Sequence, residues 1–120
     1  MQTHSGIRTA ADVAAIEAAG IPALPTSTYQ MICQGAAVNP QAKALTFFLH
    51  AHEHQNPQYF SYQALLEHIH QTANFFHSLG AEKNTVIAYV LPNLPETHFV
   101  IWGGQATGIV AAINPLLEPH

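Results

Sequence analysis

Three closely spaced histidines are the first group in the sequence with an evident chemistry. His50, His52 and His54 are separated by single residues, so on an extended strand all three imidazoles would share one face. A zinc site uses three or four fixed ligands of this kind. The run lies in a polar stretch that contains Pro57 and predicts a turn, with no cysteine beside it. We therefore favour solvated turn histidines over a metal site, and a histidine-rich metal carrier stays as an alternative.

The other metal-ligating and thiol side chains favour structural roles. His70 and His77 fall on one face of a stretch with helical periodicity, whereas His68 falls on another face. We interpret all three as ordinary helix residues. Cys33 is the single cysteine, which excludes a disulfide within this sequence and fits a reducing compartment. It is expected to act as a small buried apolar side chain.

Signatures of nucleotide-binding and nucleophilic sites are missing from the sequence. There is no Gly-x-Gly-x-x-Gly, no Gly-Lys-Ser/Thr phosphate loop and no Gly-x-Ser-x-Gly nucleophile elbow. Glu67, Glu82 and Glu96 are scattered, so no pair of carboxylates is indicated. We therefore predict that this sequence holds no catalytic, cofactor-binding or metal-binding residue.

An apolar stretch near the end of the sequence carries the remaining pocket candidates. Phe99, Trp102 and Gly103 could line a pocket, but we favour core packing because large aromatic side chains dominate cores. Gly104 and Gly108 are four residues apart, so one helix face can approach a neighbouring backbone closely. We favour a helix–sheet contact over a membrane dimer motif, because the stretch 99–113 is too short to span a bilayer.

Composition limits the class of protein. Hydrophobic residues make up 48% of the 120 residues and charged residues only 8%, which argues against disorder. The net charge of −4 disfavours nucleic acid, because neutralising phosphates needs many Lys and Arg. So few charges also predict that part of the surface is covered by a partner or by further chain. We expect no secretory signal, no transmembrane segment and a cytoplasmic location.

The segment 85–96 is the expected centre of the fold. Its continuous apolar run from Val86 to Leu91 predicts a strand covered on both faces, as in parallel sheets. Pro92 ends that strand, Asn93 is the expected helix cap, and Pro95 fits the first helical turn. A helix over 95–107 and a second buried strand over 109–113 complete a βαβ unit.

The preceding chain supplies a hairpin and helices. Ser61 caps a predicted helix whose apolar residues recur every three or four positions and which Gly80 ends. The other expected elements are helices over 9–19 and 29–37, a linker over 21–26, and a hairpin of strands 43–49 and 59–62 joined by a turn. The predicted fold class is α/β: a partial βαβ layer with parallel strands, an N-terminal β-hairpin and two short leading helices. We divide the chain into a helical lead-in (1–42) and an α/β part (43–120).

Four stretches of the α/β part carry a family resemblance. They are 60–66 (FSYQALL), 73–80 (ANFFHSLG), 86–93 (VIAYVLPN) and 107–117 (TGIVAAINPLL). In this order and spacing they resemble the N-terminal part of the AMP-forming acyl-CoA synthetases, of the adenylate-forming ligase superfamily. The resemblance covers residues 43–119 and implies the first subdomain of that family's large AMP-binding domain. Ala64, Asn84-Thr85 and Thr107 depart from the usual pattern, all at structural positions.

The resemblance implies a ligase that works in two steps. A carboxylic acid, with a fatty acid as our expectation, reacts with ATP and magnesium to give an acyl-adenylate, and coenzyme A then displaces AMP. The family's phosphate loop, its nucleotide-binding motifs and its catalytic lysine lie further along the chain, so none is carried over to this sequence. The 120-residue chain is then a truncated adenylation domain, inactive alone, whose apolar surface is covered by the rest of that domain or by an oligomeric partner. The alternative is a non-catalytic association module that uses the same piece of fold.

Overall fold

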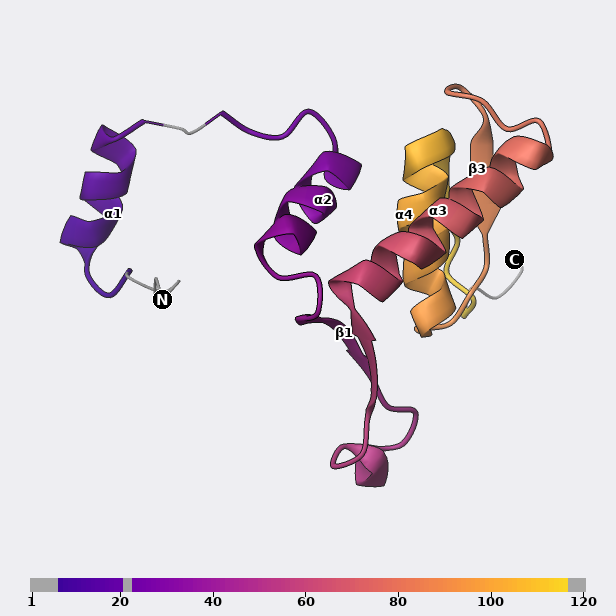
Figure 1. Cartoon of the computed structure of the whole chain (residues 1–120), viewed down its shortest axis with the longest axis horizontal. Helices are drawn as coiled ribbons and strands as arrows, with labels where there is room; N and C mark the ends of the chain where they lie inside the picture. The colour runs from indigo at the N-terminus through magenta and orange to yellow at the C-terminus, as the bar shows by residue number, and fades with distance from the viewer. Residues whose placement is uncertain (1–6, 21–22, 117–120) are drawn as a thin grey trace.

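The fold is described for residues 7–20 and 23–116 in a computed structural model (Figure 1). Its elements, in chain order, are α1 (Ala10–Ala18), α2 (Thr28–Val38), β1 (Lys43–Phe47), the short 3₁₀ helix η1 (Ala51–Glu53), β2 (Gln58–Ser61), α3 (Tyr62–Ser78), β3 (Val86–Tyr89), α4 (Pro95–Thr107) and β4 (Ile109–Ala112). The α/β class, the hairpin, the parallel pair and the two leading helices are confirmed. Ile21 and Pro22 of the predicted linker lie outside the described residues.

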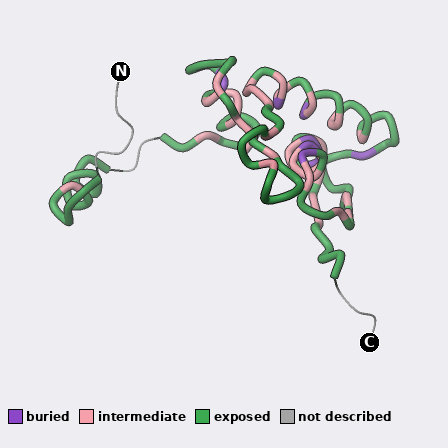
Figure 2. The backbone as a smooth tube through the Cα atoms, turned by 90° about the horizontal axis from the view of Figure 1, so that it is seen from below, coloured by how far each residue is buried: buried purple, intermediate pink, exposed green. Residues whose placement is uncertain are grey.

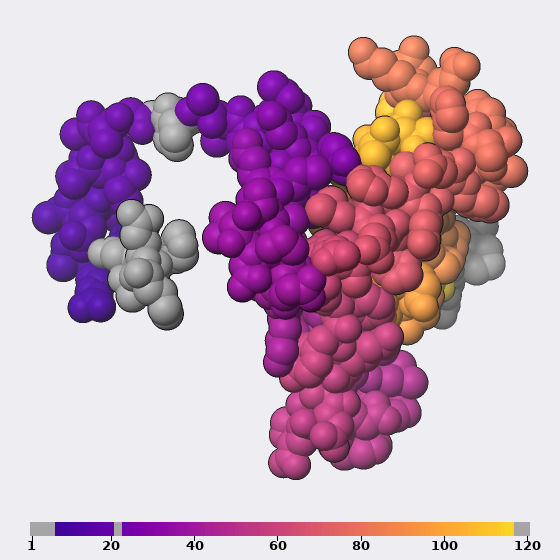
Figure 3. Space-filling model, viewed as in Figure 1, coloured from indigo at the N-terminus to yellow at the C-terminus, as the bar shows by residue number. Residues whose placement is uncertain are grey.

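The leading helix α1 is well capped but unpacked. The Thr9 hydroxyl accepts from the backbone N–H of Asp12, and the Asp12 carboxylate accepts from the backbone N–H of Thr9 at 2.8 Å. Gly20 then adopts a left-handed conformation (φ +79°) after the helix end. No residue of α1 is buried, and the helix stands apart from the rest of the chain in ribbon, burial and space-filling views (Figures 1, 2 and 3).

Helices α3 and α4 form the centre of the molecule. The predicted cap of α3 is confirmed, because the Ser61 hydroxyl accepts a hydrogen bond from the Ala64 N–H at 3.1 Å. Leu65 and Ile69 on α3 meet Phe99 on α4, and Ile69 is fully buried, with 0% of its surface exposed. The two helices approach closely at Gly103, where an added Cβ would lie 2.6 Å from Thr72 Cβ. The core is therefore a helix–helix contact with the hairpin and α2 packed against its edge (Figure 1).

The antiparallel pair β1–β2 matches the predicted hairpin. Its register places Leu45 opposite Phe60 and Thr46 opposite Tyr59. Leu45 and Phe60 pack against the core, whereas the Lys43 ammonium lies 3.7 Å from the centre of the exposed Tyr59 ring. One side of the hairpin is thus apolar and the other carries polar and amphipathic groups.

The parallel pair β3–β4 and helix α4 form the predicted βαβ unit. Val86 pairs with Ile109 and Tyr89 with Ala112, and α4 spans the predicted range. The predicted helix–sheet contact of the glycines is also confirmed. A Cβ on Gly104 would lie 2.5 Å from Val110 Cγ2, and a Cβ on Gly108 would lie 2.5 Å from the Thr85 carbonyl oxygen.

One prediction about this unit is wrong. Asn93 does not cap α4: the cap position is Leu94, because Pro95 is the first helical residue and a cap must directly precede it. The Thr97 hydroxyl instead donates to the Pro92 carbonyl oxygen at 2.6 Å. Within residues 7–20 and 23–116, α3 and α4 pack on only one side of the strands, so the cover of their second face stays a prediction.

Candidate functional site

The histidine run lies in a turn and not on a strand. η1 follows His50 directly, so His50, His52 and His54 do not alternate along an extended backbone. The rings of His50 and His52 stack with centroids 5.5 Å apart, while the His54 ring contacts the Ala51 carbonyl oxygen at 2.8 Å through Nδ1. Within the ranges 7–20 and 23–116, no three His, Cys, Asp or Glu side chains are grouped to hold a metal ion.

The histidines of α3 have three different surroundings. His68 is half-buried and stacks on the Phe99 ring with centroids 4.2 Å apart. His77 is exposed and lies 3.3 Å, through Nδ1, from the Ala81 carbonyl oxygen. His70 is exposed and bonds to a tyrosine of another helix. Packing and local hydrogen bonding thus account for His68 and His77, while His70 joins two helices.

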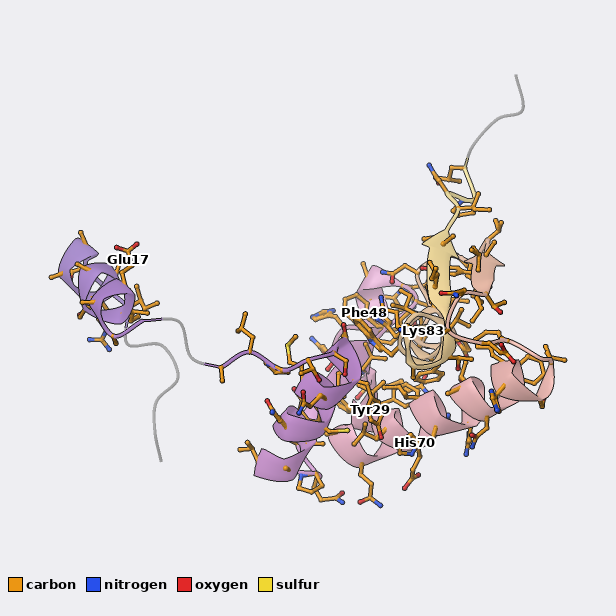
Figure 4. All side chains as sticks on the ribbon, turned by 90° about the horizontal axis from the view of Figure 1, so that it is seen from above. Glu17, Tyr29, Phe48, His70 and Lys83 are labelled. Atoms are coloured by element: carbon orange, nitrogen blue, oxygen red, sulfur yellow. The ribbon has the colours of Figure 1, made fainter. Side chains whose placement is uncertain are left out.

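A tyrosine–histidine pair links α2 to α3. Tyr29 Oη lies 2.8 Å from His70 Nε2, and the two side chains point toward each other from neighbouring helices (Figure 4). Cys33 lies on α2 one turn after Tyr29 and is half-buried. The Cys33 thiol raises the pKa of the Tyr29 hydroxyl by hydrogen bonding. Partial burial of Tyr29 raises this pKa further. No local pattern indicates this pair, because its members are 41 positions apart in the chain.

The pair lies at the edge of a wide cleft. This cleft has a volume of 730 Å³ and is lined by the start of α2, by α3, by the end of α4 and by β4. Ser27, Tyr29 and His70 give it a polar side, and Ile109 and Val110 give it an apolar wall. It can therefore take an amphipathic group with an aliphatic part and a hydrogen-bonding part.

The predicted pocket residues divide between core and cavity. Phe99 is buried in the core, and Gly103 is packed against Thr72. Trp102 also packs against the core, but it lines a 260 Å³ cavity with Leu65, His98 and others. Core packing is therefore confirmed for Phe99 and Gly103, and Trp102 has both roles.

The sheet presents an uncovered apolar surface, which we call the outer face. It consists of the residues of the parallel pair that point away from α4: Val86, Ala88, Val90, Ile109, Ala111 and Ile113. The four largest of these side chains are between 44% and 59% exposed. No polar or charged side chain interrupts the outer face, and a parallel sheet is ordinarily covered on both sides. Within the described residues, the outer face is therefore exposed apolar sheet surface.

Positive side chains are remote from every cleft described above. Arg8 precedes α1, Lys43 covers the Tyr59 ring, and Lys83 lies in the exposed turn before β3. None of them lines the clefts at α2, α3, α4 or the sheet. A bound triphosphate needs several such donors or a loop of backbone N–H groups.

None of the helices described in the structure has the length and apolar character needed to cross a membrane.

Comparisons with known proteins point to one family. The family model described as AMP-binding enzyme matches residues 33–120. The marinolic acid–CoA ligase of Pseudoalteromonas sp. (strain SANK 73390) is 41% identical over 76 residues, which are 63% of this chain and 12% of that ligase. The crotonobetaine/carnitine–CoA ligase of Salmonella paratyphi A (strain ATCC 9150 / SARB42) is 46% identical over 59 residues, 48% of this chain and 11% of that ligase. The chain thus matches only a small part of the length of these relatives.

Proposed function

The chain belongs to the AMP-binding enzyme family, and we propose that it is the N-terminal part of the adenylation domain of an AMP-forming acid–thiol ligase. Two relatives that it resembles carry the name of a CoA ligase, each for a different acid. The family match over residues 33–120 is the observation that carries the proposal. In this proposal residues 1–42 are a helical lead-in and residues 43–120 begin the adenylation domain.

The proposed reaction joins a carboxylic acid to coenzyme A in two steps. The carboxylate attacks the α-phosphorus of ATP, pyrophosphate leaves, and an acyl-adenylate forms. The thiol of coenzyme A then attacks the acyl carbon, and AMP leaves. Magnesium would balance the phosphate charge during the first step. We propose a fatty acid as the acid, and a cytoplasmic location, which the single half-buried Cys33 suits.

The outer face supports the view that further polypeptide belongs with this chain. Val86, Val90 and Ile109 expose aliphatic surface that a completed parallel sheet would bury. We propose that the rest of the adenylation domain covers it. Arg8, Lys43 and Lys83 line none of the clefts, which supports the proposal that the nucleotide is bound by residues beyond those described here.

Two measurements test this function. The first is the intact mass of the protein as its own cell makes it, which should lie far above 13.0 kDa. The second is pyrophosphate release from ATP with a panel of fatty acids, followed by coenzyme A thioester formation. We expect activity from the native protein and none from the purified 120-residue chain. Activity of the 120-residue chain would contradict the proposal, as would a native mass of 13.0 kDa.

The outer face also favours one alternative function. A short protein that used this face for association would be a binding module rather than an enzyme. It should form a monodisperse oligomer that melts cooperatively and releases no pyrophosphate. Aggregation or a non-cooperative transition of the 120-residue chain would instead favour the ligase fragment.

A further inference from the structure

A small cavity lies where the hairpin runs into α3, between four elements of the fold (Figure 1). Its volume is 260 Å³, and its aliphatic wall comes from Ile32 of α2, Leu45 of β1 and Leu65 of α3. The indole of Trp102 on α4 adds an aromatic surface. Leu65 belongs to the buried core, and the other three side chains pack against that core. The wall is therefore fixed by packing, as in a pre-formed ligand pocket.

Two polar side chains reach the same cavity. His98 lies one turn before Trp102 on α4, and Tyr62 is the first residue of α3. The Tyr62 ring is held against α2, because a Cβ added to Gly35 would lie 3.4 Å from its Cε1 atom. Within the described residues, the imidazoles that form hydrogen bonds are those of His54, His70 and His77. The His98 imidazole can therefore bond to the hydroxyl of a ligand.

The lining of the cavity favours a neutral ligand with one ring. No Lys, Arg, Asp or Glu lines it, so a charged group would lose its hydration there without gaining a partner of opposite charge. A dry cavity of about 150 Å³ accepts benzene, so 260 Å³ leaves room for one aromatic ring with a small substituent. The Trp102 indole offers that ring a stacked or edge-on contact.

We propose that this cavity binds a neutral, single-ring phenol, with the ring among Ile32, Leu65 and Trp102 and the hydroxyl bonded to His98. The bound ring contacts α2, α3 and α4 together, and it therefore stabilises the packing of α2 on the other two helices. No outer-face residue lines the cavity, so the site is separate from the surface assigned to a covering layer. This inference goes beyond the proposed ligase function and does not depend on it, because the ligand is neither the acid nor the nucleotide.

Fluorine NMR of two small probes tests the cavity in the protein as its cell makes it. The probes para-fluorophenol and para-fluorotoluene have nearly the same shape, but only the first has a hydroxyl. Ala44 lines the cavity, so Ala44→Leu should fill it and abolish the binding of both probes. Ala106→Leu is the matched control, because Ala106 is exposed and lines a different cleft, and it should leave both affinities unchanged.

His98→Phe separates the hydrogen bond from the apolar wall. It should lower the preference of the site for para-fluorophenol over para-fluorotoluene by about tenfold, the equivalent of one hydrogen bond. An unchanged preference would overturn the role of His98. This comparison remains decisive if Ala44→Leu does not fold, because His98→Phe retains a ring at that position.

Three other results would also overturn the proposal. The first is loss of binding in Ala106→Leu as well as in Ala44→Leu, which would indicate binding outside the cavity. The second is equal affinity for para-fluorobenzoate and para-fluorophenol, since the site would then not select a neutral ligand. The third is the absence of binding of either probe to the native protein, because further chain would then occupy the cavity.

Hydrogen exchange of the α2 amides (Thr28–Val38) gives a second readout. At a para-fluorophenol concentration about ten times its Kd, exchange over α2 should slow by about tenfold. Equal slowing in the wild-type protein and in Ala44→Leu would contradict binding in the cavity. The assay needs no ATP or acid, so its outcome is separate from that of the pyrophosphate test.

Discussion

The two strand pairs of this molecule are built from similar residues but differ in their exposed sides. In β1–β2, Leu45 and Phe60 face the core, and the other side presents Thr46 and the Lys43–Tyr59 contact. In β3–β4, the outer face is aliphatic, and the side that faces α4 is apolar apart from the hydroxyl of Tyr89. The antiparallel pair thus has one side suited to water, whereas the parallel pair has none.

This difference separates a strand pair that packs on its expected partner from one that has a layer on one side only within the described residues. A hairpin with alternating polarity needs one packing partner, and α3 with α4 provides it. A parallel pair needs a layer on each side, and within residues 7–20 and 23–116 only one layer is present. Variants that act on one pair and spare the other can therefore test the comparison.

The largest effect should come from the shared core. Ile69→Ala removes a fully buried side chain of α3 and should lower the free energy of unfolding by about 2–5 kcal/mol. The hairpin packs on α3 and β4 packs on α4, and the two helices meet at this core, so both strand pairs should lose hydrogen-exchange protection together. Urea unfolding followed by Trp102 fluorescence gives the energy, and Ile16→Ala on the exposed α1 serves as the control. Loss of protection in one pair alone would show two independent cores.

A substitution in α4, the helix that connects β3 to β4, should affect the parallel pair selectively. In Gly104→Ala the new Cβ would lie 2.5 Å from Val110 Cγ2, and the overpacking should cost about 1–3 kcal/mol. Gly35→Ala is the matched control, because its Cβ would lie 3.4 Å from the Tyr62 ring and a helix gains from Ala. Thermal unfolding and exchange of the β3 and β4 amides measure both. Equal destabilisation by the two changes would contradict the close approach at Gly104.

An isosteric swap tests whether the outer face is covered in the native protein. Val86→Thr places a hydroxyl on the outer face, and Thr46→Val removes one from the solvated side of the hairpin. In the 120-residue chain each change should stay within about 0.5 kcal/mol. In the native protein Val86→Thr should cost about 1–3 kcal/mol, because the hydroxyl would be buried without a partner. Equal unfolding energies for Val86→Thr in both forms would mean that nothing covers this face.

The cap between the hairpin and α3 has a smaller expected effect. Ser61→Ala leaves the Ala64 N–H without its partner and should cost about 1 kcal/mol. Ser61→Asp should retain most of the stability, since a carboxylate also accepts at this position. Thermal unfolding of the three proteins would decide this, and similar losses for both variants would rule out a capping role.

Alkaline pH should weaken the packing of α2 through Tyr29. The pKa of Tyr29 is raised in the folded chain, so its contribution is fully present below the ordinary value of 10.0. That contribution is lost as the pH rises through the higher folded pKa. The stability of the wild-type chain above pH 10 should therefore fall more steeply than that of Tyr29→Phe. Parallel curves in a pH series of unfolding midpoints would contradict this assignment.

Local signals in the sequence were sufficient for most elements. Ser61, Gly80 and Pro95 act through their own backbone neighbourhoods, and they mark the ends of α3 and α4 as predicted. The close contacts of Gly104 and Gly108 with the sheet were also predicted, from their spacing of four residues. The prediction that Asn93 caps α4 was wrong, because Pro95 is the first helical residue and the cap position is therefore Leu94.

Non-local arrangements could not be predicted in the same way. The Tyr29–His70 pair and the cleft beside it depend on how α2 packs on α3. The exposure of the outer face depends on what lies against the sheet, which the apolar run itself does not encode. The histidine run, by contrast, was predictable from local composition: the predicted turn is confirmed, because the backbone enters η1 directly after His50.

The parallel pairing of β3 and β4 has a consequence for folding during synthesis on the ribosome. Val86 pairs with Ile109, which is synthesised 23 positions later. At about 5–20 residues per second, β3 waits roughly 1–5 s for its neighbour. During that interval an apolar, uncharged strand lacks its partner, and this composition favours aggregation. The earlier hairpin can close at once, so translation speed and chaperone access between codons 86 and 109 should govern the yield of folded protein.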